Sequence, residues 1–441
     1  MLKFMKKVIV FAFLIVGIVF SYLYFRSSDV FLTVIGPMDM ADGIGRQSFE
    51  LIKALENDFK INYKPTVNSK KVPKNIKIIN KWSRDVGKVI LFEDVLAFCS
   101  TKHLDAWLTN KRKKSICIAY TMLESTRIPE PMVYNLNTYF DAAVVPDPFL
   151  VEAYEASGVK IPVFYVPLGL YLDNFLNEPL KDKKNTPFVF ANLSSCINRK
   201  NTLALIRAFY QAFKDNPDVI LKINFRTGEE PYIHDVINEI GKLECDRIMV
   251  TRNCLTSDDY LKFYKHIDCY INLAKGEGFS IQPREAMILG IPVIVSDNTG
   301  QSTIVASNLV RSVKSQITEP AYYIFSNFQN KPPHGLKYGK LVECTSFISG
   351  TYGCNYGCKI EDAIIAMKDV YENYEKYLAK KEKARAWASQ YQYTKLTPLY
   401  KNIVLPKKVI LGKDNKITKE YLMTSSFSLY KKYCRLLESV K

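Results

Sequence analysis

Histidine and tryptophan are scarce in this sequence, which has 4 His and 3 Trp among its 441 residues. With histidine only at His103, His234, His266 and His334, neither a histidine-centred catalytic triad nor a histidine metal cluster is indicated. The chain lacks the sequence G-x-x-x-x-G-K-[ST], so a P-loop nucleotide site is not expected. It also lacks an Asp-x-Asp pair that could hold a divalent metal ion.

Glycine and proline are also infrequent, at 19 and 20 residues, which argues against a disordered chain or a repetitive fibre. Hydrophobic residues make up 48% of the chain and charged residues 24%, which is a globular composition. Aromatic residues are plentiful, with 28 Tyr and 25 Phe. At roughly 100–200 residues per domain, a chain of this length predicts two main folding units.

Positive charge exceeds negative charge, giving a formal net charge of +17. The excess is concentrated at the carboxyl end, where residues 376–441 contain 16 basic and 4 acidic side chains. Such a surface attracts anionic lipid head groups, nucleic acid or an acidic acceptor, or is simply a solvated helical surface. Nucleic acid is the least favoured of these, because no zinc-finger spacing, RRM signature or arginine-rich arm is present.

Ten cysteines are spread along the chain, and those within apolar runs, such as Cys117 and Cys269, are expected to be buried and structural. Cys344, Cys354 and Cys358 instead lie in or near a stretch rich in Gly and Tyr. A disulfide, for example Cys354–Cys358, would form there in an oxidising compartment. A zinc site is less favoured because a fourth ligand is not evident.

The first 28 residues are predicted to form a short tail and a membrane anchor. Val8–Phe25 is apolar or aromatic except at Gly17 and Ser21, and its 18 residues just suffice to span a hydrocarbon core. A cleaved signal peptide would have a shorter core ending in small residues, whereas this segment ends in Tyr and Phe. An uncleaved anchor is therefore expected.

The charges around this segment predict its orientation. Lys3, Lys6 and Lys7 precede it and Arg26 follows it closely, so the positive-inside tendency keeps the amino terminus in the cytoplasm. A type II topology with the main folding units on the lumenal or extracytoplasmic side is favoured. The basic carboxyl end would suit a cytoplasmic leaflet better, so a cytoplasmic location also stays open.

Apolar runs alternating with polar or helical segments predict an α/β fold with two Rossmann-like domains facing across a cleft. Residues 29–173 form the first domain, 174–186 a polar linker, and 187–385 the second domain. Residues 386–441 form a basic helical tail. The strands are expected at residues 29–36, 88–92, 115–120, 142–145 and 163–166, and then at 188–191, 219–225, 247–250, 269–273 and 293–295.

Two glutamates stand out in the segment 276–294. Glu277 is placed in a strand-to-helix loop, and Glu285 in the opening turns of the helix that follows. Gly278 allows the backbone to approach a ligand, and the start of the helix offers free N–H groups and a positive dipole end to a phosphate. Carboxylates also favour a helix amino terminus for purely structural reasons.

The same segment closely resembles the E-x-x-x-x-x-x-x-E motif of the group 1, or family-four, glycosyltransferases, which have the GT-B fold. The resemblance implies that Glu277 faces the donor sugar and that Glu285 holds the ribose. It further implies that Gly278, Phe279 and Ser280 line the donor sugar and diphosphate. Retention of the anomeric configuration is implied by the resemblance as well.

A second match is the stretch 192–201, which is similar to the family's Arg-Lys phosphate loop. It implies that Arg199 and Lys200 clamp the diphosphate, whose departure develops negative charge that a site must neutralise. In the first domain, Gly43 and Gly45 resemble the glycine loop that faces the donor phosphates, although Gly-x-Gly is also common in tight turns. Glu124 resembles an acceptor-side residue.

We therefore expect a retaining, metal-independent hexosyltransferase that needs no cofactor. Its donor is a nucleotide diphosphate sugar, with GDP-mannose favoured over UDP-hexoses, and its acceptor is a glycan, lipid or protein. Nucleic acid is not an expected partner. The alternatives are a nucleotide-sugar epimerase or phosphorylase of the same fold, and a non-catalytic sugar-nucleotide-binding scaffold.

Overall fold

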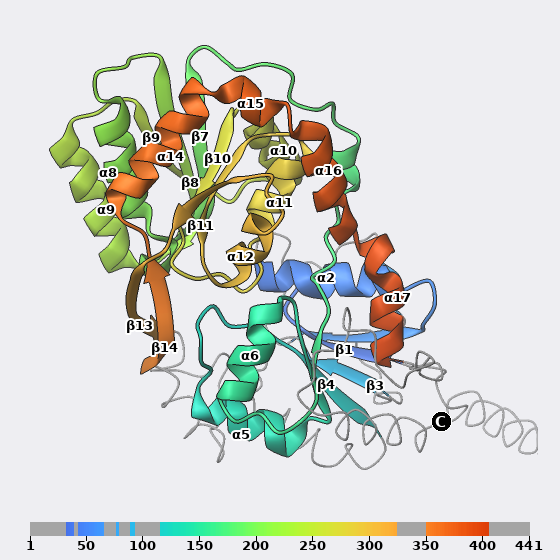
Figure 1. Cartoon of the computed structure of the whole chain (residues 1–441). Helices are drawn as coiled ribbons and strands as arrows, with labels where there is room; N and C mark the ends of the chain where they lie inside the picture. The colour runs from blue at the N-terminus through green and yellow to red at the C-terminus, as the bar shows by residue number, and fades with distance from the viewer. Residues whose placement is uncertain are drawn as a thin grey trace, which may run out of the picture.

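The computed structural model describes residues 32–38, 43–65, 76–78, 89–92, 115–323 and 350–404. Within them the chain forms two α/β domains, one above the other in Figure 1. Each domain is built on a six-stranded parallel sheet. The predicted pair of Rossmann-like domains is therefore present.

The first domain has the strand order β2-β1-β3-β4-β5-β6. Its central strands are short apolar runs buried along their length, which is typical of a parallel sheet covered by helices. Its elements are β1 (Leu32–Gly36), α2 (Gly43–Leu55), β2 (Ile61–Pro65), β3 (Val89–Phe92), β4 (Ile116–Tyr120), α5 (Glu130–Tyr139), β5 (Ala142–Val145), α6 (Pro148–Ala156) and β6 (Val163–Tyr165).

The second domain has the strand order β12-β11-β10-β7-β8-β9. Thr256 caps α10 as its spacing from Asp259 indicates, since its side chain accepts a hydrogen bond from the Asp259 backbone N–H. The elements of this domain are α7 (Asp173–Leu176), β7 (Phe188–Cys196), the 3-10 turn Asn198–Lys200, α8 (Thr202–Phe213), β8 (Val219–Gly228), α9 (Glu230–Leu243), β9 (Ile248–Arg252), α10 (Ser257–Lys265), β10 (Cys269–Asn272), α11 (Ile281–Ile288), β11 (Val293–Asp297), α12 (Thr299–Val305) and β12 (Arg311–Lys314).

An antiparallel ribbon follows β12. It consists of β13 (Ile317–Tyr323) and β14 (Gly350–Gly357), and it extends from the second domain toward the first (Figure 1). Cys354 and Cys358 in this region are free thiols, so they form no disulfide with each other, and Cys344 lies outside the described residues.

The last described helices lead the chain back to the first domain. They are α14 (Ile360–Glu372), α15 (Tyr374–Leu378), α16 (Lys381–Ala388) and α17 (Tyr393–Val404). Helix α14 packs on α8, α16 on α11, and α17 on α2 of the first domain. The predicted basic helical tail from 386 onward is largely helical as far as residue 404, and its helix α17 packs on α2, with Leu396, Tyr400, Ile403 and Val404 buried.

The chain crosses between the domains at two adjacent places. Leu170 and Gln392 form a parallel β-bridge, and the Leu170 N–H donates to the Tyr391 carbonyl at 2.7 Å. The predicted linker 174–186 begins inside α7 and is attached to the second domain: the Lys181 ammonium lies 2.9 Å from a carboxylate oxygen of Asp268. It is a packed segment because its polar residues find partners on that domain.

The predicted anchor Val8–Phe25 lies outside the described residues, as do residues 405–441 of the basic carboxyl end. Among the helices that the structure describes, none combines the length and the apolar character needed to cross a membrane.

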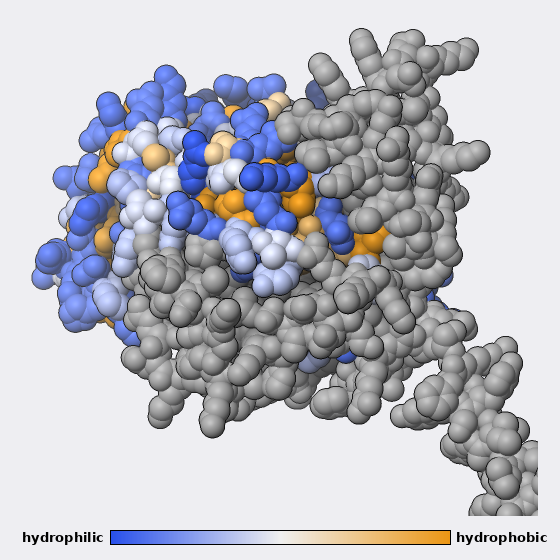
Figure 2. Space-filling view, turned by 90° about the horizontal axis from the view of Figure 1, so that it is seen from below, coloured by the Kyte–Doolittle hydropathy of each residue, from blue (hydrophilic) through white to orange (hydrophobic). Residues whose placement is uncertain are grey.

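The described surface seen from below is largely hydrophilic, with a smaller hydrophobic area near its middle (Figure 2). Most large apolar side chains are buried in the two domains.

Candidate functional site

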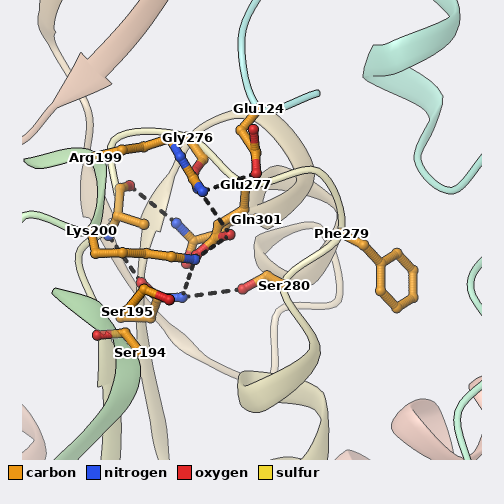
Figure 3. Close-up of polar contacts among 12 residues, drawn as sticks. Glu124, Ser194, Ser195, Arg199, Lys200, Gly276, Glu277, Phe279, Ser280 and Gln301 are labelled. Atoms are coloured by element: carbon orange, nitrogen blue, oxygen red, sulfur yellow. Dashed lines mark hydrogen bonds and ion pairs between the residues drawn. The ribbon is translucent and has the colours of Figure 1, made fainter. Parts of the chain in front are cut away.

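Two loops of the second domain meet beside the first domain and bring the predicted cations and the predicted carboxylate together (Figure 3). The 3-10 turn that carries Arg199 and Lys200 follows β7, and Glu277 lies between β10 and α11. The Lys275 N–H donates to the Arg199 carbonyl at 2.8 Å, which joins the loops directly. Both loops follow the carboxyl ends of parallel strands, where ligands commonly bind in such sheets.

Glu277 is the centre of this cluster. The Lys200 ammonium lies 2.6 and 2.8 Å from its two carboxylate oxygens, and the Asn272 amide donates to it at 3.2 Å. The Arg199 guanidinium lies 3.4 Å from the same carboxylate and donates to the Gly276 carbonyl at 2.6 Å. Burial raises the pKa of Glu277, but Lys200 and Arg199 outweigh that effect and bring it below its usual value. Glu277 is therefore an ionised carboxylate.

The backbone of Glu277 is fixed from α12. Its N–H donates to the Thr299 hydroxyl at 2.8 Å, and its carbonyl accepts from the Gly300 N–H at 2.9 Å. Any side chain at Gly300 would collide with this loop, because a Cβ there would lie 2.8 Å from the Glu277 carbonyl oxygen. The Glu277 carboxylate is thus held on a rigid support.

Gly276 and Gly278 bring this loop against the first domain. A Cβ at Gly276 would collide with the Glu124 carbonyl, and one at Gly278 would lie 2.8 Å from the Met122 sulfur. Glu124 itself reaches across, with its carboxylate 2.9 Å from the Arg199 guanidinium. The cluster therefore includes Glu124, as Figure 3 shows, and lies at the boundary between the domains.

Glu285 lies in a separate buried network. One carboxylate oxygen accepts from Arg46 of α2 at 2.8 Å, and the other accepts from the Tyr260 hydroxyl at 2.6 Å and the Tyr264 hydroxyl at 3.2 Å. Arg46 also pairs with Glu50 at 3.0 Å. The ribose contact inferred for Glu285 stays a prediction. The structure adds Arg46, an interdomain partner that the sequence did not single out.

Gly43 and Gly45 occupy the first turn of α2. The sequence-based description of them as part of a loop is wrong, because the helix already begins at Gly43 and includes the buried Gly45. Neither glycine belongs to the polar cluster of Figure 3. Their contact with donor phosphates stays a prediction.

Phe279 and Ser280 face different surroundings. Phe279 points away from the polar cluster (Figure 3), and its ring lies 5.4 Å from that of Tyr391. The guanidinium of Arg284, a fully buried residue that sequence reasoning missed, lies 3.8 Å from the Phe279 ring centroid. Ser280 stays in the cluster, since its hydroxyl accepts from the Asn272 amide at 3.2 Å. The Phe279 side chain therefore packs inside the second domain.

The described residues contain no group of three or more His, Cys, Asp or Glu side chains that could hold a metal ion. The charges that the cluster offers to a ligand are the two cations, Arg199 and Lys200. The stretch 192–196, interpreted from the sequence as part of a phosphate loop, is the end of β7. The loop proper is thus limited to residues 197–201.

A match to a known protein family covers most of the second domain. Residues 176–316 match the family model described as glycosyl transferases group 1. This range contains Arg199, Lys200, Glu277 and Glu285, the residues on which the resemblance rests. The resemblance to group 1 glycosyltransferases is therefore confirmed. No curated protein matches the whole sequence.

Solved structures with the same architecture include a glycosyltransferase from Rickettsia africae, with 14% identity and a TM-score of 0.57 over 84% of this chain and 98% of that one. HepE of Anabaena in complex with UDP-glucose has 12% identity and a TM-score of 0.56 over 84% and 98%. The trehalose-6-phosphate synthase OtsA has 9% identity and a TM-score of 0.56 over 85% and 98%. These similarities establish the fold, which is GT-B.

Proposed function

We propose that this chain, whose second domain matches the group 1 glycosyltransferases, transfers a hexose from a nucleotide diphosphate sugar to a hydroxyl group of a glycan, lipid or protein. The observation that carries the proposal is the set of two partly buried cations, Arg199 and Lys200, around the buried Glu277 carboxylate at the domain boundary. Two fixed cations lie beside one ionised carboxylate there. The cations suit a diphosphate, and the carboxylate suits the hydroxyl groups of a sugar.

The chemistry requires neutralisation of a leaving group. When the bond between the anomeric carbon and the diphosphate oxygen breaks, negative charge develops on the diphosphate. Arg199, Lys200 and the amino end of α11 stabilise that charge. The acceptor oxygen then forms the new bond on the same face of the sugar, and its proton passes to the departing phosphate. This route retains the anomeric configuration and needs no metal ion.

The donor is proposed to be a UDP-hexose or GDP-mannose. GDP-mannose is favoured by the sequence resemblance, and UDP-hexoses are supported by HepE, whose structure is a complex with UDP-glucose. Both classes share the diphosphate that Arg199 and Lys200 would bind. A direct comparison of UDP-glucose with GDP-mannose as donors distinguishes them.

We also propose that Val8–Phe25 anchors the chain with the catalytic domains on the lumenal or extracytoplasmic side. The lysines that precede this segment support that orientation. Protease treatment of sealed, cytoplasm-side-out vesicles without detergent should leave the domains intact. Their digestion would indicate the cytoplasmic alternative.

The test of function is transfer and hydrolysis measured over a panel of nucleotide sugars, with wild type and Glu277→Gln compared. The substitution keeps the size of the side chain but removes the charge, so turnover should fall by about 10²-fold or more. Glu230→Gln, on the exposed start of α9, is the matched control and should keep wild-type turnover. Activity should persist in the presence of a chelator.

Other outcomes distinguish the rival functions. Conversion of the nucleotide sugar without transfer would identify an epimerase, and phosphate-dependent release of a sugar phosphate would identify a phosphorylase. Binding without turnover would identify a scaffold. Normal turnover of Glu277→Gln would remove this carboxylate from the mechanism, and loss of activity with chelator that manganese restores would contradict metal independence.

A further inference from the structure

The ribbon formed by β13 and β14 contacts both sides of the candidate site. On the second domain, the Tyr356 N–H donates to the Lys275 carbonyl at 2.8 Å, beside Glu277. On the first domain, the Cys354 N–H donates to the Thr126 hydroxyl at 3.0 Å, close to Glu124. The residue between these two contacts is Asn355. Its backbone position is therefore fixed relative to both domains.

Asn355 is buried and lies directly against the catalytic loop. Only 6% of its surface is exposed, and no hydrogen-bond donor of the described residues reaches its side-chain oxygen. That oxygen would lie 2.9 Å from a Cβ placed on Gly276, and the Glu124 carbonyl converges on the same point. Two oxygen acceptors, one from the ribbon and one from the first domain, thus flank Gly276.

A buried side-chain carbonyl that accepts no hydrogen bond, like that of Asn355, lowers the stability of the folded protein by about 1–3 kcal/mol. Natural proteins seldom keep such a group without a functional reason. Its neighbour across the ribbon, Glu319, is satisfied by an ion pair of 2.6 Å with Lys275. Asn355 therefore differs from Glu319, its partner across the ribbon, whose side chain is paired. A ligand that donates a hydrogen bond would satisfy the side-chain oxygen of Asn355.

We propose that Asn355 is an acceptor-selecting residue, and that its side-chain oxygen accepts a hydrogen bond from a hydroxyl of the acceptor. This inference rests on the proposed glycosyl transfer. The donor-side charges, Arg199, Lys200 and Glu277, all come from the second domain, whereas Asn355 faces the segment that carries Glu124. The ligand class is a hydroxyl-rich molecule such as a sugar, and the group is reached when the Glu124 segment moves away from Gly276.

The test uses the full chain and a panel of p-nitrophenyl glycosides as acceptors, with the donor that wild type uses best. Asn355→Leu keeps the branching and the number of heavy atoms of the side chain and replaces the amide oxygen and nitrogen with methyl groups. The KM for the acceptor should rise about 3- to 10-fold, the range for one neutral hydrogen bond, while the KM for the donor and its hydrolysis stay unchanged. Thr351→Val removes an exposed hydroxyl from the same strand and should change none of these values.

Stability separates this role from a structural one. Because Asn355→Leu removes an unsatisfied buried acceptor, its Tm should equal or exceed that of wild type. A lower Tm with parallel changes in both KM values would overturn the inference and make Asn355 a packing residue. An unchanged acceptor KM in an active variant would also overturn it. Failure of wild type to transfer from any donor is a different result, which defeats the proposed function itself.

Discussion

Arg199 makes three contacts that no other side chain could make in the same way. Its guanidinium donates to the Gly276 carbonyl and lies close to the carboxylates of Glu277 and Glu124. The planar fork suits this geometry, and it also suits the two oxygens of a phosphate. A lysine at this position would keep the charge but lose the fork.

Arg199→Ala should therefore weaken binding of UDP or GDP by about 1.5–3 kcal/mol, the range for hydrogen bonds to charged groups. Arg199→Lys should lose a smaller part of that affinity. Isothermal titration calorimetry measures both. Arg207→Ala, which removes an exposed ion pair on α8, is the control and should bind like wild type. A dissociation constant that Arg199→Ala leaves unchanged would reduce Arg199 to a structural residue.

Sequence reasoning identified the site residues whose neighbours in the chain form a pattern. Arg199, Lys200 and Glu277 follow strands of one sheet, so their motifs indicated both their type and their place. Arg46 and Asn355 act through contacts with distant parts of the chain, which no local pattern describes. Arg284 was missed because an arginine next to Glu285 normally indicates a solvated charge, whereas here aromatic rings surround it.

The Tyr400 hydroxyl group contributes to the attachment of α17 to the first domain. Tyr400 accepts from the Gly169 N–H at 2.6 Å and donates to the Pro167 carbonyl at 2.8 Å. Tyr400→Phe would leave the Gly169 N–H buried without its acceptor, so the free energy of unfolding should fall by about 1–3 kcal/mol. Urea denaturation measures the change. The exposed Tyr134 of α5 provides the control, and Tyr134→Phe should have no effect.

A loss no larger for Tyr400→Phe than for Tyr134→Phe would show that the Tyr400 hydroxyl does not stabilise the attachment of α17. The two substitutions remove the same atom, so a difference between them reports only the surroundings of the hydroxyl.

Asp147 connects α6 to α12 and should make stability depend on pH. It caps α6 and accepts from the Thr303 hydroxyl at 2.8 Å. Burial raises its pKa from the usual 3.8 to about 6, although Arg284 opposes the change. The folded chain therefore binds this proton more tightly than the unfolded chain. The stability gained from the protonated form of Asp147 is therefore fully present below about pH 3.8, and it is lost as the pH rises through about 6.

Asp147→Asn removes this dependence while keeping the cap. At about 1.4 kcal/mol for each pH unit between the two pKa values, the variant should gain up to ~3 kcal/mol relative to wild type between pH 4 and pH 7. Chemical denaturation at several pH values tests this, with Asp258→Asn on the exposed start of α10 as control. Parallel stability profiles for wild type and Asp147→Asn would contradict the assignment.

Most strands could be predicted because each is a short apolar run bounded by polar residues. The expected strand at 142–145 matches β5. The ribbon could not be predicted, since β13 and β14 are separated by 26 residues and neither is strongly apolar. The packing of α17 was missed because the basic excess of residues 376–441 suggested a solvated surface, although α17 itself has only two lysines and buries Leu396, Tyr400, Ile403 and Val404.

The two domains are joined by a buried ion pair in addition to the backbone. Arg46 of the first domain lies between Glu285 of the second and Glu50 of its own helix, and Glu50 also accepts from the Tyr171 N–H at 3.0 Å. Arg46→Met would leave two buried carboxylates without their cation. The free energy of unfolding should fall by about 3–5 kcal/mol.

Adding Glu285→Gln to Arg46→Met should recover part of this loss, because one unpaired charge is removed as well. Arg252→Met, which breaks an exposed pair with Glu230, should cost at most about 1 kcal/mol. Urea midpoints compare all three variants. If the double variant is less stable than Arg46→Met, Glu285 contributes through its other partners, Tyr260 and Tyr264.

The two adjacent crossings of the chain at Leu170 and Gln392 act geometrically as a pivot at one edge of the molecule. The ribbon lies at the opposite edge in Figure 1. When a rigid body turns about a pivot, the arc travelled by a point grows with its distance from the axis. The same rotation therefore separates Cys354 from Thr126 further than it separates Glu50 from Tyr171. A label on the ribbon would register changes in the angle between the domains with the greatest lever arm.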